Sequence, residues 1–166
     1  MCIRDRRETV QSMEKNYPNI EVSYEFVDAV AMRLVQWPNS YDVLITSNLF
    51  GDILTDEASV ISGSMGLMPS ASVGSENALY EPIHGSYPEA AGKNIANPIA
   101  SILSLSMMLD HSFNLKKESE IINIAVEESL KNKYVTPDLS SDKNSFSTDQ
   151  VGDYIVDLSL IHISEP

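Results

Sequence analysis

Three aspartates have the types and positions to bind a hard divalent cation. Asp52 and Asp56 are four residues apart at the start of segment 52–61, whose apolar residues recur at helical spacing. Side chains four apart share one face of a helix, so the two carboxylates can converge on one ion, and Asp28 could supply a third. Mg²⁺ and Mn²⁺ prefer such oxygen ligands and keep positions open for water or substrate. Spacing alone nevertheless favours a plainer explanation, because acidic residues in a first helical turn complement the helix dipole.

A polar loop, residues 84–96, could bind a second ligand. His84, Gly85 and Ser86 form a tight turn after a predicted strand at 79–83. Glycine has no side chain, so a ligand can approach the backbone there. At the end of the loop, Asn97 and Pro98 have the types expected at the N-cap and first position of a helix.

This loop does not have the signature of a Rossmann dinucleotide site. No G-x-G-x-x-G follows the first predicted strand, and the glycines at 63–66 have the wrong spacing. On the residues alone, structural explanations are favoured: His84 pins a turn, Glu89 is solvated surface and Asn97 only caps a helix.

Strands and helices alternate along the chain and would position these residues. Apolar alternation or short β-rich runs predict strands, and 3.6-residue periodicity predicts helices. The predicted strands are 20–27, 43–46 and 79–83, and the predicted helices are 7–17, 29–35, 52–61, 97–110, 118–131 and 148–158. This order predicts an α/β fold with a mixed, largely parallel sheet flanked by helices. Ligands of such folds gather where strands end, and Asp28, the 47–52 loop and the His84 loop all follow predicted strands.

The bulk composition excludes several partners. The chain has 166 residues, 43% of them hydrophobic, and a formal net charge of −13, which argues against nucleic acid or an anionic membrane surface as a partner. Its single cysteine, Cys2, cannot form an internal disulfide, and neither a membrane span nor a secretory signal is recognisable. We therefore expect a cytoplasmic protein. Residues 1–6 and 159–166 join poorly to the periodic segments beside them, so we expect non-native additions at both ends.

Long stretches of the sequence resemble one enzyme family. The segment NLFGDILTDEASVISGSMGLMPSAS (48–72) closely resembles a diagnostic segment of the isocitrate/isopropylmalate dehydrogenase family. The resemblance continues through VDAVAM (27–32), LYEPIHGSYPEAAGKNIANPIASIL (79–103) and MMLDH (107–111). It covers the C-terminal half of the family's fold. Isocitrate enzymes typically differ at residues 49–52, so the resemblance favours the isopropylmalate branch.

The resemblance implies a metal site shared within a homodimer. Asp52 and Asp56 would bind Mg²⁺ or Mn²⁺ in one subunit, and Asp28 would reach into the site of the partner subunit. Residues 7–62 would belong to the dimer-interface and metal domain, and 63–158 to the C-terminal part of the cofactor domain. The family's catalytic tyrosine and lysine and its substrate arginines lie upstream of the matched part, so no catalytic residue is assignable.

The resemblance also implies that the polar loop binds the adenosine half of NAD. The implied cofactor-binding residues are Glu81, His84, Gly85, Ser86, Glu89 and Asn97. Glu89 stands where the family usually has Asp; a carboxylate there accepts hydrogen bonds from ribose hydroxyls and repels a 2′-phosphate, which favours NAD over NADP. Tyr87 and Ala90 depart from the family's usual small and larger aliphatic residues at these positions.

The implied activity is NAD-dependent oxidative decarboxylation of 3-isopropylmalate in leucine biosynthesis, with this chain inactive by itself. Two alternatives stay open. One is a related homoisocitrate or tartrate dehydrogenase, since the metal and cofactor segments serve the whole family. The other is a non-catalytic acidic dimerisation module that binds neither metal nor cofactor.

Overall fold

The computed structural model describes residues 3–140 and 145–164. The chain divides into two compact units, Met1–Leu44 and Ile45–Pro166. None of the helices in the described part of the chain is long and apolar enough to cross a lipid bilayer.

The first unit contains two α-helices and a short 3₁₀ helix. Helix α1 spans Ile3–Glu14, α2 spans Val27–Gln36, and η1 spans Pro38–Ser40. Val30 and Leu34, one turn apart on α2, are buried, as expected for the apolar face of an amphipathic helix. These helices confirm the predictions at 29–35 and, in part, at 7–17, where the helix ends at Glu14, ahead of Pro18.

The second unit contains the remaining helices and both strands. Its elements are α3 (Asn48–Ser62), η2 (Met65–Leu67), β1 (Pro69–Val73), β2 (Ala78–Pro82), η3 (Pro88–Ala90), α4 (Ile99–His111), α5 (Lys116–Lys131) and α6 (Thr148–Ser164). Helix α3 ends at Gly63, whose φ of 97° is the left-handed conformation that glycine adopts without steric cost. The four helices and the strand predicted in this region are confirmed.

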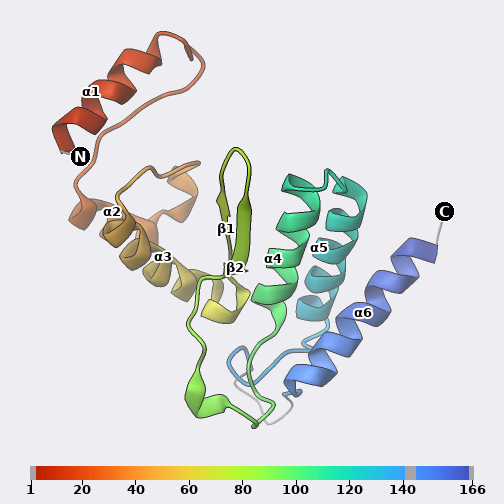
Figure 1. Cartoon of the computed structure of the whole chain (residues 1–166). Coiled ribbons are helices and arrows are strands. Elements are labelled where there is room, and N and C mark those ends of the chain that lie inside the picture. Colours follow the sequence, from red (N-terminus) through yellow and green to blue (C-terminus); the bar gives the residue numbers. More distant parts are fainter. Residues whose placement is uncertain (1–2, 141–144, 165–166) are drawn as a thin grey trace. The chain divides into compact units, whose positions relative to one another are not determined.

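The core of the second unit lies among α4, α5 and α6, which lie side by side in sequence order (Figure 1). Its buried centre consists of Ile99, Ala125, Val126, Val151 and Ile155. The ring of Tyr134 stacks between two others, with ring centroids 3.6 Å from Phe146 and 4.2 Å from Tyr154. Tyr134 and Phe146 also pack against the buried core.

The sheet of the described residues has two strands, and they are antiparallel. Pro69 of β1 pairs with Pro82 of β2, and Val73 pairs with Ala78. Helix α4 packs against both strands. Strand β1 was not predicted, because PSASV has small residues in place of the large alternating apolar ones that mark a strand.

The strands predicted at 20–27 and 43–46 are wrong for this chain: residues 20–26 and 43–47 have no regular secondary structure, and Val27 opens α2. A strand exists only when a neighbour pairs with its backbone, and no described segment pairs with these. Their apolar side chains are correspondingly uncovered, with Phe26 76% and Val43 79% exposed. A largely parallel sheet is therefore not formed within the described residues.

The two ends that we expect to be non-native continue neighbouring helices. Residues 3–6 belong to α1 and 159–164 to α6. A helix can extend through any residues of adequate propensity, so this continuity does not test their origin. The division into domains at residues 62 and 63 also stays a prediction.

Candidate metal and cofactor site

Helix α3 presents two carboxylates of the predicted metal site to solvent. Asp52 and Asp56 are one turn apart and both exposed. The Asn48 side chain donates a hydrogen bond from Nδ2 to Asp52 Oδ2 at 2.8 Å. Since Asp56 has no side-chain partner among the described residues, its oxygens are available to a ligand.

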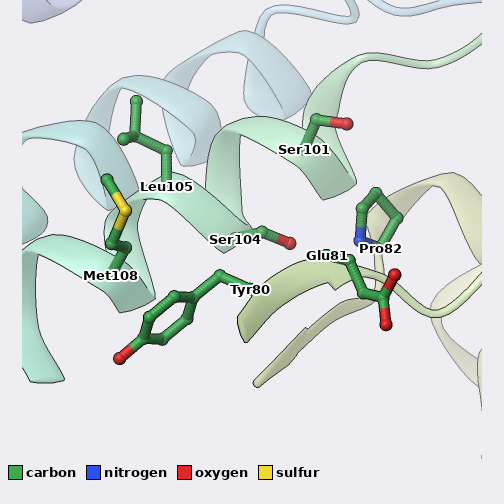
Figure 2. Close-up of a pocket in the computed structure, with 7 residues that line it drawn as sticks. All are labelled: Tyr80, Glu81, Pro82, Ser101, Ser104, Leu105 and Met108. Atoms are coloured by element: carbon green, nitrogen blue, oxygen red, sulfur yellow. The ribbon is translucent and has the colours of Figure 1, made fainter. Parts of the chain in front are cut away.

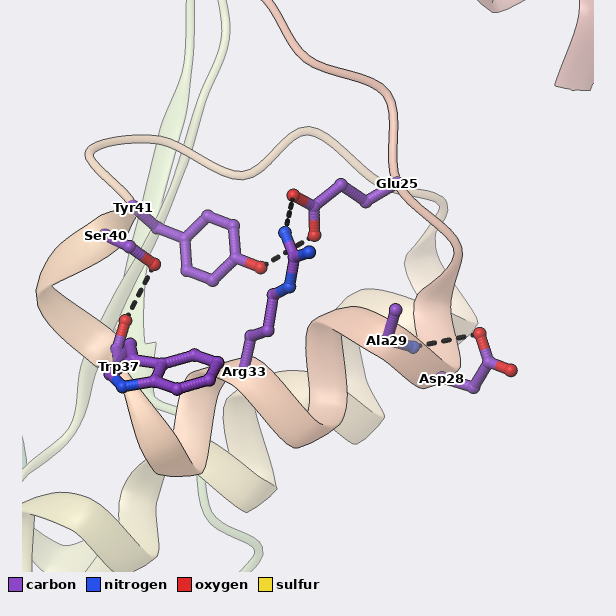
Figure 3. Close-up of polar contacts among 7 residues, drawn as sticks. All are labelled: Glu25, Asp28, Ala29, Arg33, Trp37, Ser40 and Tyr41. Atoms are coloured by element: carbon purple, nitrogen blue, oxygen red, sulfur yellow. Dashed lines mark hydrogen bonds and ion pairs between the residues drawn. The ribbon is translucent and has the colours of Figure 1, made fainter.

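Asp28 lies at the start of α2, in the other compact unit. Its Oδ1 accepts a hydrogen bond from the Ala29 backbone N–H at 2.9 Å (Figure 3). Around the same helix, Glu25 accepts hydrogen bonds from Arg33 Nη1 at 2.5 Å and from the Tyr41 hydroxyl at 2.8 Å. These two contacts hold the segment before α2 against the end of that helix, so they help to fix the turn that carries Asp28.

Two of the three predicted metal ligands, Asp52 and Asp56, lie on one element, α3. Across residues 3–140 and 145–164, no three His, Cys, Asp or Glu side chains come together as a metal-binding group. The pair on α3 nevertheless fits part of a Mg²⁺ or Mn²⁺ site, because two exposed carboxylates one turn apart can offer oxygen ligands and leave other positions open. Asp28 as the third ligand stays a prediction.

The predicted cofactor loop follows β2 and is largely open to solvent. His84 Nδ1 lies 2.9 Å from the Gly85 carbonyl oxygen, a local contact that folds the turn. Gly85 and Ser86 are exposed, and a Cβ at Gly85 would meet no atom within 4 Å. Glu89 is exposed in the first turn of η3. The backbone and carboxylate that we predicted to bind the adenosine half of NAD are therefore accessible.

Asn97 has a structural role that uses both ends of its amide. Its Oδ1 accepts a hydrogen bond from the Ile99 N–H at 3.0 Å, which caps α4, and its Nδ2 donates to Asp138 Oδ2 at 3.1 Å. The capping predicted from the Asn-Pro pair is confirmed. Whether Asn97 also contacts cofactor stays a prediction.

Sequence analysis missed Asp138, which is hydrogen-bonded both to the turn that follows α3 and to Asn97 before α4. It accepts hydrogen bonds from the side chains of Ser64, of Thr136 at 2.5 Å and of Asn97. Partial burial by itself would raise the pKa of Asp138, but these donors together hold it below its ordinary value of 3.8. Asp138 was missed because its sequence neighbours, Thr-Pro-Asp-Leu, indicate only a turn, whereas Ser64 is 74 residues away along the chain.

A pocket of about 300 Å³ lies between β2 and α4 (Figure 2). Its lining is Tyr80, Glu81 and Pro82 from β2 with Ser101, Ser104, Leu105 and Met108 from α4. Glu81, one of the predicted cofactor residues, thus lines a mainly apolar pocket.

The sequence matches the family model described as isocitrate/isopropylmalate dehydrogenase over residues 3–155. It is 53% identical over 136 residues to the 3-isopropylmalate dehydrogenase of Aquifex aeolicus and 50% identical over 151 residues to that of Wolinella succinogenes. The matches cover 82% and 90% of this chain but 37% and 42% of those proteins. The chain therefore spans about two-fifths of the length of these relatives.

Solved structures confirm the predicted fold family. An isocitrate dehydrogenase from Methylococcus capsulatus matches with a TM-score of 0.88 and 41% identity, over 92% of this chain and 45% of that one. A β-decarboxylating dehydrogenase from Thermococcus kodakarensis matches with a TM-score of 0.83 and 37% identity, over 97% and 46%. With its exposed aspartate pair, its open polar loop and a family match over most of its length, this chain belongs to the isocitrate/isopropylmalate dehydrogenase family.

Proposed function

We propose that the protein to which this chain belongs oxidatively decarboxylates 3-isopropylmalate with NAD in leucine biosynthesis. The observation that carries this proposal is the identity of about 50% to curated 3-isopropylmalate dehydrogenases. The open aspartate pair and polar loop support it, because both are placed to meet ligands from solvent. The acidic charge of −13 and the relatives' metabolic role fit a cytoplasmic protein without a nucleic-acid or membrane partner.

Asp52 and Asp56 would bind Mg²⁺ or Mn²⁺, and Asp28 would complete the site from the partner subunit of a homodimer. The ion would supply Lewis acidity for both the oxidation and the decarboxylation of the substrate. The three aspartates would hold the ion and leave coordination positions for the substrate's hydroxyl and carboxylate. Asn48 holds one oxygen of Asp52 and so orients the carboxylate.

Glu81, His84, Gly85, Ser86, Glu89 and Asn97 would bind NAD. Backbone groups at Gly85 and Ser86 are exposed for close approach, and the Glu89 carboxylate can accept hydrogen bonds from ribose hydroxyls. None of the described residues is proposed as general acid or base, since the family's catalytic tyrosine and lysine match no position here.

A second candidate substrate is isocitrate or a related hydroxy acid such as homoisocitrate or tartrate. It is favoured by the close structural match to an isocitrate dehydrogenase. A third possibility, a non-catalytic dimerisation module, predicts that neither Mn²⁺ nor NADH binds. The curated relatives favour 3-isopropylmalate over both.

A chimera tests the proposal. In the Wolinella succinogenes enzyme, the stretch matched over 151 residues is replaced by this chain, and the rest of that enzyme is kept. The purified chimera is assayed with NAD and Mn²⁺. We expect oxidation of 3-isopropylmalate that stops when the ion is chelated. Because the donor enzyme contributes substrate residues, the matched control carries Asp52→Asn and should lose turnover. Full activity of that control, or no activity of the chimera, would overturn the proposal.

A further inference from the structure

The far end of the proposed cofactor loop is hydrogen-bonded to the start of α6. Asn94 Nδ2 donates to Asp149 Oδ2 at 2.8 Å, and the Asp149 N–H donates back to Asn94 Oδ1 at 3.2 Å. The Thr148 N–H donates to the Asn94 carbonyl at 3.0 Å, and the Thr148 hydroxyl donates to the Ala96 carbonyl at 2.5 Å. These hydrogen bonds, which we call the α6 clamp, join segments more than fifty residues apart.

The α6 clamp holds a backbone conformation that the loop would not keep without it. Asn94 has a φ of 55°, in the left-handed region that is costly for residues with a Cβ, although asparagine tolerates it better than most. A conformation of this kind persists where surrounding contacts over-determine it. Here the carbonyl and both side-chain polar atoms of Asn94 are all engaged by Thr148 and Asp149.

The rest of the loop is tied only to itself. Its backbone hydrogen bonds run from Ala90 to Tyr87, from Ala91 to Pro88 and from Lys93 to Ala90. Among the described residues, hydrogen bonds from 84–96 to other segments are made at Asn94 and Ala96 alone. The α6 clamp is therefore the main polar restraint on where the exposed Ser86 and Glu89 lie.

We propose that Thr148 and Asp149 are positioning residues for the cofactor: through the α6 clamp they hold the loop in the conformation that binds NAD, without touching NAD. The inference rests on the proposed function, since it takes 84–96 as the cofactor loop. A pre-ordered loop binds more tightly because less conformational entropy is lost on binding. Loss of the clamp should thus weaken NAD binding and leave the chemical step alone.

Ser147 provides a matched control, since it stabilises the same helix end and its hydrogen bonds among the described residues go to Gln150 and not to the loop. Its Oγ accepts a hydrogen bond from the Gln150 N–H at 3.3 Å, and its N–H donates to Gln150 Oε1 at 3.0 Å. Ser147→Ala therefore weakens the start of α6 by removing a cap hydrogen bond and leaves the hydrogen bonds of the α6 clamp in place. Asp149→Ala instead removes one hydrogen bond of the clamp, from Asn94 Nδ2 to Asp149 Oδ2.

The first measurement is hydrogen–deuterium exchange of the 166-residue chain. We expect Asp149→Ala to speed exchange of the amides of residues 87–96, and Ser147→Ala to leave them as in the unsubstituted chain. Asp149→Asn should restore protection, because its side-chain oxygen can still accept from Asn94 Nδ2. Equal exchange in the two alanine variants would overturn the clamp.

The second measurement is steady-state kinetics in the Wolinella chimera. Asp149→Ala should raise KM for NAD about threefold to tenfold, the range expected for one lost hydrogen bond, with kcat changed less than about twofold. Ser147→Ala should change neither constant. A chimera without NAD-dependent turnover would overturn the proposed function and this inference with it. An active chimera with the same KM for NAD in Asp149→Ala would overturn only the clamp.

Discussion

Asp138 shows how one carboxylate can hold distant segments together. Its three side-chain donors, Ser64, Thr136 and Asn97, come from the turn before η2, the segment after α5 and the start of α4. Each of these hydrogen bonds is stronger to the ionised carboxylate than to the protonated form. Protonation should therefore weaken the attachment of η2 to α4.

The lowered pKa of Asp138 predicts how stability depends on pH. A carboxyl group whose pKa is lower when folded adds stability that is fully present above its unfolded pKa, near 3.8, and is lost as pH falls through the folded value. We expect Asp138→Asn to reduce the free energy of unfolding by about 1–2 kcal/mol at pH 7, with a smaller difference from the unsubstituted chain below the unfolded pKa. Urea unfolding between pH 7 and pH 3 measures this; a pH-independent difference would refute the role of the charge.

Glu89 makes a prediction about cofactor choice in the chimera. Glu89→Lys removes a carboxylate that would accept ribose hydroxyls and adds a charge that attracts a 2′-phosphate. We expect the ratio of kcat/KM for NAD to that for NADP to fall by about tenfold or more. Glu76→Lys makes the same charge change at an exposed position in the turn between β1 and β2, and serves as control. Equal ratios in the two variants would exclude Glu89 from cofactor selection.

Among the secondary-structure elements, η2 packs close to the start of α4 because Gly66 has no side chain. A Cβ on Gly66 would lie 2.5 Å from Asn97 Cβ, closer than two carbon atoms can pack. Gly66→Ala should therefore push η2 from the start of α4 and lower the free energy of unfolding by about 1–3 kcal/mol. Gly152, within α6, has nothing within 4 Å of its Cβ position, so Gly152→Ala should stabilise by about 0.5–1 kcal/mol. Urea titrations that give both variants the same sign would contradict this packing.

The helices could be predicted because their signals are local. Periodic apolar residues, and at α4 the Asn97-Pro98 pair, are read within a few turns of chain, and α2 to α6 all lie where the sequence placed helices. The strands at 20–27 and 43–46 could not be settled in this way, because a strand depends on a partner distant in sequence. The same non-local dependence hid Asp138 and the Asn94–Asp149 contact.

The candidate site was predictable only as residue types. Sequence spacing put Asp52 and Asp56 on one helix face, which α3 confirms, and it anticipated the Asn97 cap. Sequence could not show that Asn97 is also bound by Asp138, nor that the loop is fastened at Asn94, because these partners are 41 and 55 residues away. Side-chain contacts between residues far apart in the chain produce no periodic pattern in the sequence.

For the whole molecule, we predict that the 166-residue chain alone does not oxidise 3-isopropylmalate. It carries the aspartate pair and the proposed cofactor loop, but no residue of it is assigned to proton transfer. Mn²⁺ binding should be weak and should strengthen with protein concentration, because Asp28 would complete the site only in a dimer. Mn²⁺ titration at several protein concentrations, with an activity assay in parallel, measures both effects.

The control for this experiment is Asp52→Asn, which removes one of the two carboxylates on α3 and should weaken Mn²⁺ binding further. Measurable turnover by the chain would show that the residues in hand suffice for catalysis. Binding that does not respond to Asp52→Asn would remove the proposed metal site from α3.

The stacked ring of Tyr134 and the single tryptophan belong to different compact units, so each unit has its own optical signal. Rings held face to face in a fixed asymmetric setting give near-ultraviolet circular dichroism, and this stack belongs to Ile45–Pro166. The sole tryptophan, Trp37, belongs to Met1–Leu44 and is 60% exposed. Its fluorescence follows the other unit. A single denaturant series read by both methods therefore reveals whether the two units unfold together, since coincident curves mean one cooperative transition and separated curves mean two.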